Sequence, residues 1–240
     1  MSTKKPTILL WTILITSCTV TNNLYVTDPV PQGKGNSYLY AGFGTGLSPD
    51  IDSTSVNGDI HFSDKLILVP SFCFGGQVGL GNQLDLRFDL HLPYIITGIG
   101  LHGGIQYSLF KKWTQFNAAV GTDLGFIFAK DTLSLGSTKI VLDPDTKGAL
   151  NADFFLPVSY TLKKNYRVVL TPRISCNTLF IKRNVYSEKS QKYSPIYPAL
   201  SFGAFLNKLY IEATAMYIEN SIRPGFGIVY LFPDNNDAHE

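Results

Sequence analysis

The residues of this chain whose types and spacing could do chemistry are an aspartate and two histidines. Asp89 and His91 lie in the run Leu84–Leu92, where apolar and ionisable residues alternate, and His102 lies in the next run of this kind. Because residues two apart on a strand share a face, we expect the three on one face of two neighbouring antiparallel strands. Such a group could bind a metal ion or transfer protons. A polar interior that merely hydrogen-bonds both histidines explains the same pattern, and the sequence favours that interpretation, without a metal ion.

The Leu84–Leu92 run also gives its strand one apolar face and one ionisable face. Similar runs recur along the chain behind an export signal, and several are longer than ordinary globular strands, which suits a tilted membrane crossing. We therefore expect the apolar rows to face lipid and the ionisable rows to face a lumen. Both signs of charge occur inside, so salt bridges and hydrogen bonds should form a polar network there. Its expected members are Asp85, Arg87, Asp89, His91, His102, Asp123, Asp153, Arg167, Arg173 and Glu212.

These runs predict an all-β chain: a single antiparallel, up-and-down transmembrane β-barrel of about ten strands over residues 37–232. A closed barrel is required because every backbone group at membrane depth needs a protein partner. The expected strands are 37–47, 66–80, 83–95, 98–110, 114–129, 148–162, 165–181, 196–206, 208–219 and 222–232.

The connections between these strands alternate in length. Tight turns are expected near residues 81–82, 111–113, 163–164 and 207, and longer connections at 48–65, 130–147 and 182–195. Two further connections, near 93–97 and 220–221, are short but fall on the same side as the long ones. Short turns at one rim and long loops at the other are typical of bacterial outer-membrane barrels, whose strand number is even. Both termini should then be periplasmic. Nine aromatic residues fall near strand ends and suit interfacial girdles: Tyr38, Tyr40, Tyr107, Trp113, Tyr160, Tyr166, Tyr210, Tyr217 and Tyr230.

Prolines interrupt two of the expected strands. Pro70 and Pro172 each lie inside an otherwise strand-like run. Proline has no N–H to donate to a ladder, so we expect bulges or bends at both positions.

The N-terminus has the features of a processed envelope protein. Two lysines precede a short apolar run and then small residues, which predicts a signal peptide over residues 1–17. Residues 15–18, Ile-Thr-Ser-Cys, resemble the bacterial lipobox, which would make Cys18 the lipidated first residue of the mature chain. Residues 18–36 would then form a linker, and residues 233–240 a polar tail. In the expected register Cys73 points inward and Cys176 outward, so no disulfide should join them.

Composition and motifs exclude several classes of function. Charged residues make up only 16% of the 240 residues, and the formal net charge is +2, so nothing favours nucleic acid as a partner. Phosphate-binding loops, nucleophile elbows, Cys-x-x-Cys pairs and His-Glu-x-x-His runs are missing from the sequence. We expect neither an enzyme nor a cofactor.

The signal, lipobox, alternating strands and rim asymmetry together resemble the small bacterial, Bacteroidota-like outer-membrane β-barrel or porin-like families. The resemblance concerns architecture over residues 37–232, and two features depart from it. Typical members are not lipoproteins, and most end on the terminal aromatic residue, whereas this chain continues past Phe232. The resemblance implies a Gram-negative outer-membrane location, contacts with membrane lipid and lipopolysaccharide, and an envelope protein as a candidate partner.

The expected role is structural, partner-binding or narrow-pore transport, with the extracellular loops as a binding surface. Two alternatives stay open. An omptin-like hydrolase would use Asp89, His91 and His102 at the rim. A soluble lipocalin-like lipoprotein would need the opposite facing, with Leu84, Phe88 and Leu92 inside.

Overall fold

The computed structural model describes most of the chain from Val26 onward. The described ranges are 26–54, 60–93, 98–110, 114–129, 132–135, 138–141, 146–163, 166–181, 191–193, 196–218 and 221–233. The expected signal peptide, Cys18, the start of the linker and the tail beyond Pro233 lie outside them. No helix within the described ranges is long and apolar enough to cross a membrane.

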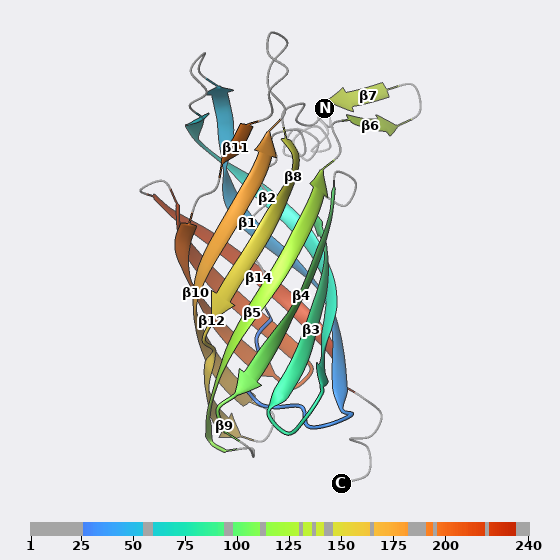
Figure 1. Ribbon diagram of the computed structural model, residues 1–240, viewed down its shortest axis with the longest axis vertical. Coiled ribbons are helices and arrows are strands. Elements are labelled where there is room, and N and C mark those ends of the chain that lie inside the picture. The colour runs from blue at the N-terminus through green and yellow to red at the C-terminus, as the bar shows by residue number, and fades with distance from the viewer. Residues whose placement is uncertain are drawn as a thin grey trace, which may run out of the picture.

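The described strands form a closed antiparallel barrel of ten wall strands, as the sequence predicted (Figure 1). The wall closes where the first strand pairs with the last. Going round it, the strands are β1 (Ser37–Thr54), β2 (Ile60–Gly79), β3 (Leu84–Pro93), β4 (Gly98–Ser108), β5 (Phe116–Ala129), β8 (Thr146–Phe155) continued by β9 (Val158–Lys163), β10 (Tyr166–Ile181), β12 (Ile196–Leu206), β13 (Leu209–Ile218) and β14 (Ser221–Pro233).

One wall strand is split in two. β8 and β9 both pair with β5 on one side and β10 on the other, but Leu156 and Pro157 between them belong to neither. The Leu156 N–H still donates to the Pro172 carbonyl (3.1 Å), and the Pro157 carbonyl accepts from the Ala119 N–H (3.0 Å). The irregularity expected at Pro172 of β10 therefore occurs in the neighbouring strand, between β8 and β9. Pro70 pairs in regular register with Thr45, so the expected bulge there is wrong.

The hairpin of β1 and β2 is longer than the sequence indicated. Residues 48–65 were expected to form a loop, but β1 continues to Thr54 and β2 starts at Ile60. The register of this ladder shifts on either side of Ile51. These irregularities lie next to Pro49, which has no N–H to donate to the ladder. The other long connections contain short strands: β6 (Thr132–Leu135) and β7 (Thr138–Val141), which pair with each other, and β11 (Gln191–Tyr193), which pairs antiparallel with the end of β10.

The two faces of the wall have opposite character. Large apolar side chains are exposed on the outside of every wall strand, whereas the charged side chains that the structure describes in the wall's interior are buried or nearly so. In β3, Phe88 is 37% exposed and Asp85 is 0% exposed. The reversed facing required by the lipocalin-like alternative therefore does not occur. An apolar belt outside a closed hydrogen-bonded wall is what a lipid environment requires.

The three longest connections lie at one end of the barrel axis, where the short connections from β3 to β4 and from β13 to β14 also lie. The closely spaced ends of β2 and β3, and of β12 and β13, lie at the lower end in Figure 1, together with the start of β1 and the end of β14. The extended β1–β2 hairpin and the connections containing β6, β7 and β11 lie at the upper end. We call these the short-turn rim and the long-loop rim.

Candidate functional site

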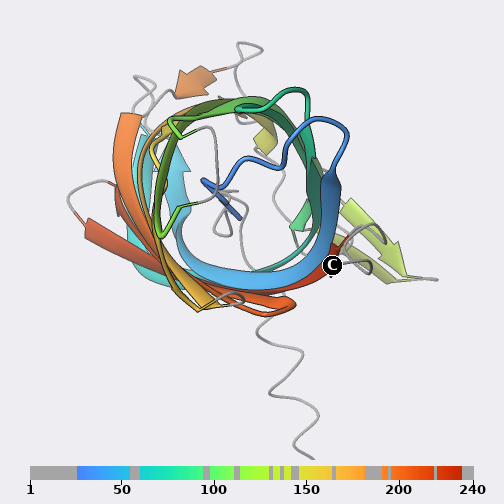
Figure 2. The ribbon, with the colours of Figure 1, turned by 90° about the horizontal axis from the view of Figure 1, so that it is seen from below.

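The lumen is occupied by the chain's own N-terminal segment. Seen from the short-turn rim, the segment before β1 bends inside the ring of strands (Figure 2). Its residues from Val26 to Val30 are all buried, although none belongs to a strand. We call Val26–Gln32 the lumen plug.

The wall satisfies the polar backbone of the lumen plug with side-chain donors. Arg87 Nη2 donates to the Val26 carbonyl (2.7 Å), Gln106 Nε2 to the Asp28 carbonyl, and Ser108 Oγ to the Pro29 carbonyl (3.0 Å). Pro29 has no N–H, and neither does Pro31, so the segment carries few backbone donors that need a partner. The site is therefore matched to an extended peptide of this composition.

A buried ion pair holds the centre of the lumen plug. Arg167 Nη2 donates to Asp28 Oδ2, and both side chains are almost fully shielded from solvent. The Arg167 guanidinium also lies over the Phe205 ring, 4.4 Å from its centroid. Asp28 Oδ1 accepts from the Val30 N–H (3.0 Å), which fixes the bend of the segment. The pair thus joins a residue of the lumen plug to the wall by a charge-assisted bond.

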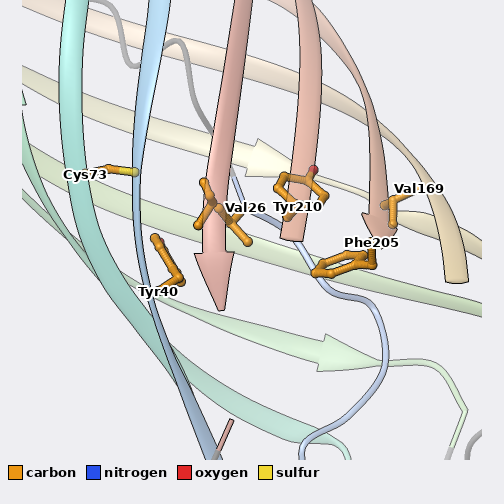
Figure 3. Packing of buried hydrophobic residues seen from close by; sticks show 7 residues of the cluster. Val26, Tyr40, Cys73, Val169, Phe205 and Tyr210 are labelled. Carbon is orange, nitrogen blue, oxygen red and sulfur yellow. The ribbon is translucent and has the colours of Figure 1, made fainter. Parts of the chain in front are cut away.

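Apolar contacts also hold the lumen plug in the lumen. Val26 packs in one buried cluster with Tyr40, Cys73, Val169, Phe205, Tyr210 and Val229, and Figure 3 shows it between Tyr40 and Tyr210. The Thr27 hydroxyl lies 2.7 Å from the Thr171 hydroxyl. The tip of the lumen plug is therefore sealed by apolar contacts as well as hydrogen bonds.

The lumen plug climbs from the short-turn rim toward the middle of the barrel. At its lower end the Gln32 N–H faces the Asp85 carboxylate (3.3 Å), and Asp85 pairs with Gly79, the last residue of β2. At its upper end, Val26 packs in the same cluster as Cys73, which lies several residues before Gly79 in β2. The lower lumen is thus filled along its axis rather than capped at its mouth.

The ten residues expected in the lumen network lie on the inner face of the wall. Nine are buried and Asp89 is half-buried. Arg87 Nη1 is 3.5 Å from Asp123 Oδ2, and Ser175 donates to Asp153. Glu212 accepts from the Tyr210 hydroxyl (2.6 Å) and from the Thr214 hydroxyl (2.9 Å).

Asp89, His91 and His102 face the same lumen, but only Asp89 and His102 are paired with each other. Asp89 pairs with His102 across β3 and β4, whereas His91 pairs with Gly100 and, on its other side, with Cys73. The part of the chain that the structure describes contains no cluster of three or more His, Cys, Asp or Glu side chains suited to a metal ion.

A small polar hollow adjoins this pair. It is lined by Tyr40, Arg87, Phe88, Asp89, His102, Gly103 and Asp123. Tyr40 donates to Asp89 Oδ2 (2.8 Å), while Asp89 Oδ1 and both ring nitrogens of His102 have no hydrogen-bond partner among the described residues. The centre of a water-sized sphere can occupy only about 10 Å³ of this hollow, which is close to the minimum space for a single water.

Sequence reasoning missed several lumen residues. Arg223 is buried inward, and its parity with Gly225 and Gly227 in the last strand could have revealed it. Tyr40 and Tyr210 were expected in the aromatic girdle, but both are buried inside, where their hydroxyl groups reach carboxylates. Asp28 lies in a proline-containing segment without periodicity, so no pattern pointed to it.

The two cysteines in the described ranges are free thiols. Cys73 is buried in the same lumen cluster as Val26, and Cys176 is half-buried in β10. Val26 of the lumen plug is therefore part of the packing around the Cys73 thiol.

A closed antiparallel wall with an apolar outside and a polar inside defines the class of transmembrane β-barrels of the outer-membrane type. No protein-family model matches the sequence, and no curated protein matches it either.

The chain has low similarity to several solved structures of bacterial outer-membrane proteins. Ail, the attachment invasion locus protein of Yersinia pestis, is 10% identical over 83% of this chain and 99% of that one, with a TM-score of 0.33. An outer membrane channel from Pseudomonas putida F1 is 12% identical over 87% and 100%, with a TM-score of 0.44. The outer membrane protein OprG from Pseudomonas aeruginosa is 10% identical over 86% and 100%, with a TM-score of 0.39.

Proposed function

We propose that this protein is a non-enzymatic, integral outer-membrane β-barrel that does not provide an open diffusion pore. The observation that carries the proposal is the filled lumen, where the lumen plug and a buried network of charges occupy the space inside the wall. A ten-stranded barrel is only slightly wider than eight-stranded barrels, which side chains can already fill. Its role is then structural or partner-binding, with at most a narrow polar path.

The proposed orientation places the short-turn rim, where β1 starts and β14 ends, in the periplasm. The long-loop rim would be extracellular and would carry the binding surface for an envelope or surface partner. The connection at 182–195 is rich in Lys, Ser and Tyr, which suits contact with lipopolysaccharide phosphates. The rim asymmetry supports this orientation.

The hydrolase alternative has weak support from the geometry. His91 and His102 are 1% and 6% exposed, and both lie inside the wall. A hydrolase of polymeric substrates needs its catalytic group where the substrate can reach it. Substrate turnover that disappears in His91→Ala and His102→Ala variants, with the fold kept, would reverse this conclusion.

The first expected result concerns membrane insertion and conductance. The purified protein should fractionate with outer membranes and migrate faster on a gel before heating than after it. In planar bilayers it should give no large, steady conductance, because the lumen is filled. A water-soluble, detergent-independent monomer would contradict the membrane assignment, and a stable wide-pore current would contradict the closed lumen.

A second expected result concerns Cys18, which we propose to be acylated after removal of residues 1–17. The mature protein should carry the mass of a lipid-modified Cys18, and a Cys18→Ser variant should lose it. Such a variant should still fold, because the barrel wall starts at Ser37. An unmodified mature N-terminus in the native protein would contradict lipidation without affecting the barrel.

A further inference from the structure

The lower lumen has the properties of a built binding site. Three wall side chains on two neighbouring strands, Arg87 of β3 and Gln106 and Ser108 of β4, donate to three carbonyl groups of the lumen plug. The Arg167 guanidinium pairs with Asp28, which is the only carboxylate of the lumen plug. Val26, at the tip of the lumen plug, packs in an apolar cluster. These contacts use backbone acceptors and one charge, which is how proteins bind an extended acidic peptide.

We propose that the lower lumen is a binding site for an extended acidic peptide, that the lumen plug fills it in cis, and that vacating it opens the barrel to ions. This inference rests on the proposed function, because it explains what closes the lumen. The occupant is the chain's own Val26–Gln32, which the structure shows in place.

The buried ion pair of Asp28 and Arg167 holds the lumen plug in this site. Both groups are buried, so departure of the lumen plug would take the Asp28 carboxylate away from a buried guanidinium. Vacating the site is therefore favoured when water or another anionic group takes the place of Asp28. This condition selects for an acidic occupant.

The tip of the lumen plug separates the rim from the polar hollow. Arg87 bonds the Val26 carbonyl with one nitrogen and also lines the hollow that contains Asp89 and His102. Removing the lumen plug would therefore connect this hollow with the short-turn opening. The same step would take Val26 out of the buried cluster that contains Cys73, which should make the Cys73 thiol more accessible.

The decisive experiment uses the full chain with Asp28→Arg, which places two cations together, and the charge-swapped double variant Asp28→Arg with Arg167→Asp. Only molecules that keep heat-modifiable migration are compared. Bilayer conductance is one readout. The other is the rate at which a charged, water-soluble maleimide alkylates Cys73, located by peptide mass.

In Asp28→Arg, both conductance and Cys73 alkylation should rise by about tenfold or more, because like charges in a buried site shift the seated segment toward release by at least this factor. The double variant should return both readouts toward the native values. Lys34→Glu is the matched control, since Lys34 is exposed at the rim outside the lumen plug, and it should change neither readout.

A synthetic peptide of residues 26–32, in which Asp28 is the only ionisable side chain, should lower the conductance of the Asp28→Arg protein, whereas a scrambled peptide should not. Native-like conductance and alkylation in folded Asp28→Arg would overturn the proposal and leave the closed barrel intact. An open native pore would instead contradict the proposed function. If Asp28→Arg does not fold, Asp28→Asn keeps the shape of the side chain without its charge, and an unchanged Cys73 rate there would overturn the proposal.

Discussion

Replacing Leu124 with arginine is expected to destabilise the folded barrel by about 2 to 4 kcal/mol in a lipid bilayer, the cost of an arginine on the lipid face near the membrane midplane. Leu124 lies near the middle of β5, points outward and is 63% exposed. In water, such a position would accept arginine with an effect within about 0.5 kcal/mol. The measurement is reversible unfolding by urea in lipid vesicles.

The matched control is Leu162→Arg. Leu162 is also an outward leucine and is 61% exposed, but it lies at the end of β9, beside Lys163 at the short-turn rim. There the same substitution should cost only about 0 to 1 kcal/mol, because the arginine reaches the interface. Equal, small effects at both positions would show that the exterior meets water, and the membrane assignment would fail.

Replacing Gly42 with valine is expected to prevent stable closure of the wall. Gly42 belongs to β1 and pairs with Val229 of β14 across the closing seam. A Cβ at this position would lie 2.4 Å from the Ile228 carbonyl oxygen and 2.8 Å from Val229 Cα. These are backbone atoms, so the two strands themselves would have to separate.

Overpacking a core costs about 1 to 3 kcal/mol by itself. Here the separation would also leave ladder groups without partners at membrane depth, at several kcal/mol for each group. We therefore expect most of the refolded Gly42→Val protein to lack the heat-modifiable band. Gly103→Val is the control, because Gly103 faces outward and the nearest atom to its Cβ is 3.8 Å away. A folded Gly42→Val barrel would show that the seam is not tightly packed.

The facing of the strands could be predicted because alternation has a strict physical cause. Between Leu84 and Leu92 each ionisable residue is flanked by apolar ones, and a strand must then present one row to each side. Facing was less certain for tyrosine, which has an apolar ring and a polar end. Tyr40 and Tyr210 therefore fitted a membrane interface equally well, until the structure showed which carboxylates lie near their hydroxyl groups.

The lumen plug could not be predicted, because its contacts are all long-range. Nothing in residues 26–32 repeats with the period of a strand or helix, and two prolines in that stretch indicate a linker. Arg167, the partner of Asp28, lies in a strand far along the chain. Only the closed wall brings that guanidinium above the segment, so the pairing is a property of the tertiary structure.

The seam between β1 and β14 joins residues that are far apart in the sequence, since Tyr38 pairs with Pro233. Contacts between such remote residues slow folding. A wall in which β14 has not yet paired with β1 has two unsealed edges. The segment carrying Asp28 could enter such an open wall from the side, whereas a closed wall would require it to pass through a rim.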